Sequence, residues 1–408
     1  MTTTAGALSG VRIFDLTRIL AGPSCTQVLG DLGADVIKIE QPGRGDDTRR
    51  WGPPYVRDAA DNETSESAYF LSANRNKRSV AIDIAKPEGQ ALAKRLLARC
   101  DILVENFKTG DLARYGLSWN DLKDEFPSLI YCSITGFGQT GPYAPYAGYD
   151  YLAQAMGGIM SLTGEPDGEP MKVGVGIADL MCGMYAATAM LAALRHRDRT
   201  GKGQQIDMAL LDTQVAWLVY EAENYLVSGQ DPPRRGNGHP NIVPYQVFET
   251  ADGHMVLACG NDRQFREFCD MAGAAHLYED PRFATNDGRC RNREALIPLV
   301  GDLMRRKTMG QWMEGLRARH VPCSPVNKVN QVFENPQVKA RGMQIEMPYP
   351  LSGAGTVPLV ASPIKMSETP PAYRHAPPTL GQHTDEVLRE LLEMDDAEIS
   401  DLREAGIV

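Results

Sequence analysis

The first third of the chain alternates short β-rich runs with segments of helical periodicity, and this alternation constrains the fold more than any other feature. The spacing predicts strands at Val11–Leu16, Asp35–Glu40, Ser79–Ile84, Asp101–Phe107 and Leu129–Phe137. Helices are expected between them, one opened by Pro23 and ended by Gly33, and another over 87–99. Near-continuous apolar strands that alternate with helices are typical of a parallel sheet covered on both faces. The pattern therefore predicts an α/β fold with a Rossmann-like parallel sheet.

The same pattern indicates where a ligand would bind. In open parallel sheets, ligands lie beyond the carboxyl ends of the strands. We therefore expect binding residues in the loops that follow Leu16, Glu40, Ile84, Phe107 and Phe137.

The whole chain, with 408 residues and 44.7 kDa, is longer than one ordinary core. A long helix is expected over about 179–198 and a further helix over Asp207–Leu226. The polar stretch 228–244, with its glycines and prolines, indicates a boundary. Beyond it, Val247–Cys259 is predicted to form a hairpin with an Asp-Gly turn. We therefore assign 225–325 to a second, smaller α+β domain.

Composition argues against several classes of partner. Lys+Arg 42 against Asp+Glu 52 give a net charge of −10, whereas binders of nucleic acid or anionic membranes need clustered positive charge. The eight cysteines form no CxxC pair, which predicts neither a zinc cluster nor a disulfide framework. The opening MTTTAGALSG lacks the features of a secretory signal, and the 15 uncharged residues Leu180–Leu194 fall short of the roughly 20 that a membrane span needs. We therefore expect a cytoplasmic protein without nucleic-acid or membrane partners, in which Leu180–Leu194 is a buried helix.

Asp179 is the most conspicuous residue that could carry chemistry. The chain has no Walker A, GxSxG or HExxH motif, and its seven histidines show no metal-ligand spacing. Asp179 lies near the start of the long helix, where backbone N–H groups and the helix dipole are expected to lower the pKa of a carboxyl. Such a carboxylate can attack an acyl carbon and form a covalent intermediate. The alternative is that Asp179 only caps the helix, as many aspartates do.

Seven segments resemble one enzyme family in the same order and spacing. They are RIFDLTRILAGPSCTQVLGDLGADVIKIE (12–40), NKRSVAIDI (76–84), LVENF (103–107), GVGIADLMCGMYAATAMLAAL (174–194), RTGKGQQIDMALLD (199–212), IVPYQVFETADG (242–253) and LGQHTDEVL (380–388). From Leu8 to its C-terminus, the chain resembles the class III CoA-transferases of the formyl-CoA transferase and carnitine CoA-transferase type. The resemblance implies interlocked, ring-like homodimers. It also implies a large CoA-binding domain formed by 1–224 and completed by 326–408, with the small domain at 225–325 between them.

The single catalytic aspartate of this family falls on Asp179. The resemblance implies that the carboxylate attacks a donor thioester to give a mixed anhydride and free CoA thiolate. The thiolate then attacks the aspartyl carbonyl and leaves an aspartyl-CoA thioester, and the acceptor acid passes through the same steps in reverse. No metal or prosthetic group is implied, because coenzyme A enters as the thioester substrate.

The resemblance also places coenzyme A contacts on residues of this chain. They are Ile19, Leu20, Ala21, Ile82, Asp83, Ile84, Ala85, Asn106, Phe107, Lys108, Arg114, Gly136, Phe137 and Gly138. Arg114 would bind a phosphate, a role that suits the fork of donors on a guanidinium. The structural alternative is that Phe107 and Phe137 belong to the core and Arg114 to the surface. Gln41 and Thr135 depart from formyl-CoA transferases, which have an arginine and a lysine there, so two positive charges are missing.

The stretch IVPYQ and the loop before it resemble succinyl-CoA:dicarboxylate CoA-transferases, which implies succinyl-CoA as donor and a dicarboxylate as acceptor. The distal carboxylate of such an acceptor would need a cation, and the candidates are Arg49 and His239. The first alternative is an α-methylacyl-CoA racemase, which pairs the aspartate with a histidine. Tyr149 stands in that segment here, and a tyrosine with a pKa of about 10 is a poor proton shuttle at neutral pH. The second alternative is a non-catalytic acyl-CoA-binding protein.

Overall fold

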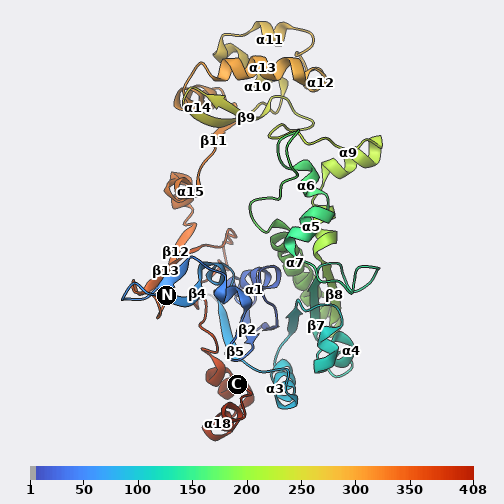
Figure 1. The fold of residues 1–408 in the computed structure, drawn as a ribbon, viewed down its shortest axis with the longest axis vertical. Coiled ribbons are helices and arrows are strands. Elements are labelled where there is room, and N and C mark those ends of the chain that lie inside the picture. The colour runs from blue at the N-terminus through green and yellow to red at the C-terminus, as the bar shows by residue number, and fades with distance from the viewer. Residues whose placement is uncertain (1–5) are drawn as a thin grey trace. The chain divides into compact units, whose positions relative to one another are not determined.

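The computed structural model describes residues 6–408, which form two compact units. The larger unit comprises the described residues up to Ile159, together with Lys172–Glu223 and Lys339–Val408. The smaller unit comprises Met160–Met171 and Asn224–Val338. Both ends of the described chain therefore belong to the larger unit. The C-terminal segment, red in Figure 1, lies beside the N-terminal strands of that unit.

The larger unit is built on a six-stranded parallel sheet in the order β5-β2-β1-β6-β7-β8. Its strands are β1 (Arg12–Asp15), β2 (Asp35–Glu40), β5 (Lys77–Ala81), β6 (Ile102–Glu105), β7 (Ile130–Thr135) and β8 (Gln204–Ala209). The chain adds β2 and β5 on one side of β1, and then β6, β7 and β8 on the other side. The strand order therefore reverses between β1 and β6, where sheets of this kind usually bind their ligands. The predicted α/β class with a Rossmann-like sheet is confirmed.

Helices cover both faces of this sheet because its strands are apolar on both sides. On β1, Ile13 belongs to a core shared with α1 (Ala21–Asp31) and α7 (Ile177–Thr200). The adjacent Phe14 belongs to a core shared with α3 (Pro87–Leu97) and α17 (Thr384–Leu392). At Gly183 of α7, an added Cβ would lie only 2.5 Å from the carbonyl oxygen of Ala21. This close approach fixes the first half of α7 against the start of α1.

Two hairpins and several short helices complete the larger unit. The hairpins pair β3 (Tyr55–Arg57) with β4 (Glu63–Ser67), and β12 (Gln344–Pro348) with β13 (Thr356–Val360). The short helices are η1 (Asp47–Arg50), α2 (Ala68–Ser72), η2 (Asp111–Tyr115), α4 (Trp119–Leu122), α5 (Asp150–Met156), α8 (Leu210–Ala216) and α18 (Asp396–Glu404). Three helices contain residues of both units: α6 (Ile159–Leu162), α9 (Tyr220–Ser228) and α16 (Pro336–Ala340).

The smaller unit is an α+β structure with a core of its own. Its antiparallel sheet has the order β11-β10-β9, from β9 (Tyr245–Thr250), β10 (Gly253–Ala258) and β11 (Cys323–Pro325). Its helices are α10 (Asp262–Ala272), α11 (His276–Glu279), α12 (Asn286–Arg291), α13 (Arg293–Met304), α14 (Met309–Ala318) and α15 (Val329–Glu334). Phe265, Phe268 and Trp312 are fully buried between the helices and the sheet. The expected hairpin is confirmed, although Ala251 and Asp252 form its turn because β10 already begins at Gly253.

Two elements differ from the sequence-based expectation. The segment Asp207–Leu226, expected to be one helix, begins as part of strand β8 and continues as α8 and α9. Its Met, Ala and Leu residues favour a helix, but β8 pairs with β7 along its whole length, and tertiary pairing overrides weak propensity. Strand β5 begins at Lys77 and ends at Ala81, whereas Ser79–Ile84 was expected. Ion pairs to Asp15 and Asp35 allow Lys77 and Arg78 to lie buried in this strand.

The long helix α7 is only partly buried. By length and composition it is the one helix in the described chain that could cross a membrane, and 44% of its most apolar stretch is buried. Core helices of globular proteins pass the same test. The expectation that Leu180–Leu194 lies buried is correct for one face only. Cys182 and Met190 are buried, whereas Tyr185 and Leu191 are exposed.

Candidate active site

A cavity of about 510 Å³ opens at the carboxyl ends of the parallel strands. Its walls come from the loops after β1, β2, β5, β6 and β7 and from the start of α7, and all of its lining residues belong to the larger unit. The cavity thus includes the point where the strand order reverses, as the topology predicts.

Most of the residues predicted to contact coenzyme A lie together in this cavity. It is lined by Ile19, Leu20, Ala21, Ile82, Asp83, Ile84, Ala85, Asn106, Phe107, Lys108, Arg114 and Gly136, as well as by Asp179. Phe137 and Gly138 do not line it. The Phe137 ring packs on Tyr143, and the Gly138 N–H donates to Oγ1 of Thr135 at 2.9 Å. The structure therefore brings the predicted set together except for these two, whereas the role of each residue toward coenzyme A stays a prediction.

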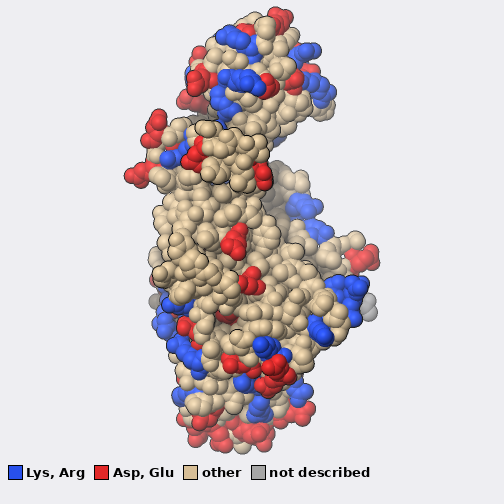
Figure 2. Space-filling view, turned by 90° about the vertical axis from the view of Figure 1, so that its right-hand side faces the viewer, with Lys and Arg blue, Asp and Glu red and all other residues tan. Residues whose placement is uncertain are grey.

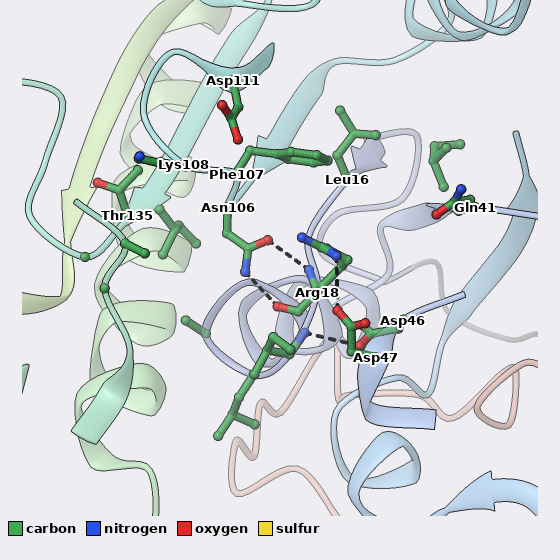
Figure 3. A pocket seen from close by; sticks show the side chains of 18 of the residues that line it. Leu16, Arg18, Gln41, Asp46, Asp47, Asn106, Phe107, Lys108, Asp111 and Thr135 are labelled. Atoms are coloured by element: carbon green, nitrogen blue, oxygen red, sulfur yellow. Dashed lines mark hydrogen bonds and ion pairs between the residues drawn. The ribbon is translucent and has the colours of Figure 1, made fainter. Parts of the chain in front are cut away.

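The side chain of Asn106 joins the loops after β1 and β6. Its Oδ1 accepts from the Arg18 N–H at 2.9 Å, and its Nδ2 donates to the Arg18 carbonyl oxygen at 2.6 Å (Figure 3). The next residue, Ile19, has a φ of +73°, in the left-handed region that β-branched residues rarely adopt. Its N–H donates to Oδ1 of Asp46 at 3.3 Å. Because such strain persists only where the surroundings enforce it, Asn106 and Asp46 define the backbone shape of this cavity wall.

Asp179 is the third residue of α7, and the N-cap residue is Gly176. The interpretation of Asp179 as a simple helix cap is therefore wrong. The capping acceptor comes from α5 instead: Oδ1 of Asp150 accepts from the N–H groups of Ala178 at 2.8 Å and of Asp179 at 3.2 Å. A neighbouring carboxylate thus satisfies the first N–H groups of α7, which have no partner within the helix.

Burial, and then the negative charge of Asp150, raises the pKa of Asp179 to about 7. The expectation that the helix terminus lowers this pKa is therefore wrong. The N–H groups that would have stabilised the ionised Asp179 are bonded to Asp150, and within residues 6–408 no hydrogen bond or ion pair reaches the Asp179 carboxyl. Burial without a partner disfavours the charged form of an acid. Strongly perturbed carboxyls of this kind are typical of catalytic groups.

Arg49 and His239, the two predicted cations for the acceptor, do not line the cavity. Arg49 is buried, with Nη2 at 2.7 Å from Glu40 Oε1 and Nη1 at 2.8 Å from Glu66 Oε2. Its guanidinium is therefore committed to structural partners, which does not support the substrate-binding role. His239 belongs to the smaller unit, where its ring packs on Tyr245, and its assignment stays a prediction.

Several charged residues that line the cavity were not predicted from the sequence: Arg18, Arg44, Asp46, Asp47 and Asp150. A signal was present for two of them. Asp150 directly follows Tyr149, the position at which a racemase would have its histidine, and Arg18 directly precedes the predicted Ile19. Tyr149 itself lines the cavity and is largely exposed, and the lining formed by residues 6–408 contains no histidine or cysteine. Among the lining residues, the carboxyls at the start of α7 are those of Asp179 and Asp150.

Comparisons with known proteins agree along the whole chain. The model of a family described as CoA-transferase family III matches residues 8–384. The chain is 49% identical over 385 residues to succinate–glutarate CoA-transferase of Agrobacterium fabrum, and the alignment covers 94% of this chain and 95% of that relative. It is 45% identical over 404 residues to succinyl-CoA:glutarate CoA-transferase of Homo sapiens, and the alignment covers 98% of this chain and 90% of that relative.

A solved structure gives the same answer for the fold. The crystal structure of a CAIB/BAIF family protein from Brucella suis is 47% identical in sequence, with a TM-score of 0.83 over 95% of this chain and 100% of the other. The family match, the named relatives and a cavity lined by the resemblance-derived residues point the same way. The chain belongs to CoA-transferase family III, the class III CoA-transferases, and is an enzyme of that family.

Proposed function

We propose that this enzyme transfers CoA from succinyl-CoA to a dicarboxylic acid through a thioester on Asp179. The observation that carries the proposal is the unpaired carboxyl of Asp179, which lines the same cavity as the predicted coenzyme A residues. The names of the relatives support the substrate class, since they specify glutarate, mesaconate and D-citramalate as acceptors of CoA from succinyl-CoA.

The proposed reaction needs no external acid or base. A carboxylate oxygen of Asp179 attacks the thioester carbon of succinyl-CoA, and the C–S bond breaks to give a succinyl–aspartyl anhydride and CoA thiolate. The thiolate attacks the aspartyl carbonyl carbon, which releases succinate and leaves the aspartyl-CoA thioester. The carboxylate of the acceptor attacks this thioester and expels the thiolate. The thiolate finally attacks the acceptor carbonyl of the new anhydride, which releases the product thioester and regenerates Asp179.

The environment of Asp179 suits this role. Among the described residues 6–408, none donates a hydrogen bond that the carboxylate would have to give up before it attacks, and burial keeps water from solvating it fully. Because its pKa is raised to about 7, both the protonated acid and the reactive anion are accessible near neutral pH. The racemase alternative needs a histidine opposite Asp179 as the second acid–base group, and Tyr149 stands at that position instead.

A trapping experiment tests the proposal. The purified full-length protein is incubated with succinyl-CoA and treated with borohydride, and the reduced residue is located by mass spectrometry. A label on Asp179 that disappears when glutarate is added before the borohydride supports the proposal. Absence of any label, together with exchange of the substrate α-proton in deuterated water, would favour the racemase. Absence of both would favour the non-catalytic acyl-CoA-binding protein.

We further propose that 1–224 and 326–408 act as one CoA-binding domain around 225–325, and that the chain forms an interlocked homodimer in the cytoplasm. Large apolar side chains are exposed on α5, α7 and α8, among them Tyr151, Tyr185, Leu191 and Val215. Figure 2, which faces this side of the larger unit, shows a wide area with few charged side chains. Such an area is typical of a surface that a partner covers. The eight free cysteines support a reducing compartment, and light scattering of the purified protein would measure the oligomeric state.

A further inference from the structure

Three charged side chains that the reaction above does not use meet at the solvent side of the cavity. Oδ2 of Asp47 lies 3.0 Å from Nη1 of Arg18, and its Oδ1 lies 3.1 Å from Nη2 of Arg44. Figure 3 shows the Arg18–Asp47 contact. One carboxylate thus bridges two guanidinium groups, and the group keeps a net positive charge. All three residues line the cavity.

The backbone that carries each arginine is held in place. The backbone N–H and the carbonyl oxygen of Arg18 are both hydrogen-bonded to the side chain of Asn106. The Arg18 guanidinium lies 5.5 Å from the centre of the Phe107 ring. Arg44 lies in a turn that is closed by the Gly45 N–H, which donates to the Gln41 carbonyl oxygen at 2.9 Å. The two loops are therefore ordered before any ligand arrives, which reduces the entropic cost of binding.

Both loops are also tied to one buried ion pair. Asp46 accepts from the Ile19 N–H in the first loop, and its own N–H donates to Glu40 at 2.8 Å in the second. The other oxygen of Asp46 lies 2.9 Å from Nζ of Lys38, and both of these side chains are fully buried. The distance between the two arginines thus depends on a rigid support beneath them and not only on their exposed contact with Asp47.

Each guanidinium keeps donors for a ligand. Within residues 6–408, Arg18 uses only Nη1 and Arg44 only Nη2, so the Nε and the other Nη of each have no protein acceptor. The two side chains are 44% and 59% exposed, so these donors can be reached. Two adjacent guanidinium groups with free donors match the geometry and charge of a phosphate. An exposed ion pair contributes little to stability, about 0–1 kcal/mol, so stability alone is a weak reason for this arrangement.

We propose that Arg18 and Arg44, spaced by Asp47, form a clamp for a phosphate of the nucleotide part of coenzyme A. This inference rests on the proposed function, which assigns coenzyme A to the cavity. Coenzyme A offers two such groups, the 3′-phosphate of the ribose and the diphosphate, and both present the same chemistry to the clamp. Arg18 and Arg44 are binding residues in this proposal, whereas Asp47 is a positioning residue.

Calorimetric titration of the full-length protein tests the clamp without turnover. The probes are free coenzyme A and 3′-dephospho-coenzyme A, and the proteins are the wild type, Arg18→Gln, Arg44→Gln and the control Arg50→Gln. Arg50 is an exposed arginine of η1 outside the cavity lining, so its variant removes the same charge a few residues away. We expect each clamp variant to bind coenzyme A about tenfold more weakly, in the range of a charge-assisted hydrogen bond, and Arg50→Gln to bind as the wild type does.

The second probe distinguishes the two phosphates. A loss of affinity for coenzyme A but not for 3′-dephospho-coenzyme A places the 3′-phosphate in the clamp, and an equal loss for both places the diphosphate there. Arg44→Lys keeps the positive charge but loses the planar set of N–H donors of the guanidinium, so it should lose less affinity than Arg44→Gln. Wild-type affinity for coenzyme A in both glutamine variants would overturn the clamp.

The failure of the clamp and the failure of the proposed function give different results. If Asp179 is labelled by succinyl-CoA while both glutamine variants bind as the wild type does, the clamp is wrong and the function remains. If coenzyme A binds with the expected dependence on Arg18 and Arg44 but Asp179 is never labelled, the function is wrong and the clamp remains. In an active enzyme, the clamp variants should raise the KM for succinyl-CoA about tenfold and change kcat less than about twofold, because the contact is remote from the reacting atoms.

Discussion

The larger unit buries carboxyl groups in two contrasting environments. Beneath the loops after β1 and β2, Lys77 and Lys38 outweigh the effect of burial and hold the pKa of Asp15 below its usual value. In the same way Lys38 lowers the pKa of Asp46 to about 2. Asp179 at the start of α7 is also buried, but its neighbour is another carboxylate, and its pKa rises to about 7. Burial alone therefore does not decide the state of a carboxyl; its partner does.

The two environments have different tasks. The paired charges hold loops: Asp46 fixes Ile19, and Glu40, which is bonded to Arg49, accepts the N–H of Asp46. The carboxyl of Asp179 makes no hydrogen bond or ion pair within the described part of the chain, so it is available to react. Substitutions in the two environments should therefore have opposite signatures, with stability lost in the first and activity lost in the second.

The largest expected effect on activity is that of Asp179→Asn. The amide is not a nucleophile, so we expect CoA transfer to fall by about 10³-fold or more, since removing the group that forms the covalent intermediate removes the reaction path. The measurement is the rate of glutaryl-CoA formation from succinyl-CoA and glutarate. The control is Asp212→Asn, the same change at an exposed position on the neighbouring helix α8. Full activity of Asp179→Asn would refute the role of Asp179.

The same variant should be more stable than the wild type. A carboxyl whose folded pKa is raised from about 4 to about 7 favours the folded state only while it stays protonated there. Wild-type stability therefore declines as the pH rises from about 4 to about 7, and the neutral amide avoids this decline. Urea denaturation at pH 5 and pH 8 should show that the advantage of Asp179→Asn grows with pH. An advantage that is the same at both pH values would contradict the raised pKa.

The opposite signature is expected for Arg49→Met. This change leaves Glu40 and Glu66 buried without their partner, and breaking a buried ion pair costs about 3–5 kcal/mol of unfolding free energy. Urea denaturation measures the loss. The milder Arg49→Lys tests the substrate role expected from the sequence. If this variant folds and its KM for the acceptor is at least tenfold higher than that of the wild type, Arg49 contacts the substrate after all.

The comparison also shows what the sequence could reveal. Apolar runs predicted β1, β2, β6 and β7 because most of the buried side chains in these strands are apolar. The start of β5 was missed because Lys77 and Arg78 are polar in sequence and become buried only through partners on β1, β2 and α17. Strand β8 was missed because its pairing with β7 is a long-range contact that no local pattern of Met, Ala and Leu records.

The site divides in the same way. The loops that line the cavity could be predicted from the strand order and the resemblance, as Ile19, Asn106 and Asp179 illustrate. The raised pKa of Asp179 could not be predicted from the sequence, because it depends in part on Asp150. Asp150 is 29 positions away and accepts hydrogen bonds from the N–H groups at the start of α7. The buried ion pair of Arg49 could not be predicted for a similar reason, since Glu66 lies 17 positions away in sequence, and its role toward the substrate stays a prediction.

The pH dependence of wild-type activity measures the pKa of Asp179 directly. Attack requires the ionised form of Asp179. On the acid limb of the profile, which should begin near pH 7, kcat/KM should therefore fall about tenfold for each pH unit. An ordinary or helix-stabilised aspartate would place this limb near pH 4 or below. The measurement is kcat/KM for succinyl-CoA between pH 5 and pH 9 in buffers of constant ionic strength. A flat profile down to pH 5 would contradict the raised pKa of Asp179, because kcat/KM reports the ionisation of the free enzyme.

The smallest expected effect separates the two causes of the raised pKa. Asp150→Asn removes the like charge but keeps an oxygen that can accept from the N–H groups of Ala178 and Asp179. The pKa of Asp179 should then fall, because its anion no longer faces a negative neighbour. The acid limb should move to lower pH, and kcat/KM at pH 6 should exceed that of the wild type by about threefold, as half a pKa unit gives. Gln154→Met is the control: Nε2 of Gln154 donates to Oδ2 of Asp150 at 2.7 Å, so this variant disturbs the same contact without a change of charge and should leave the limb in place. If both variants leave the limb near pH 7, burial alone sets the pKa, and the carboxylate pair contributes only the cap of α7.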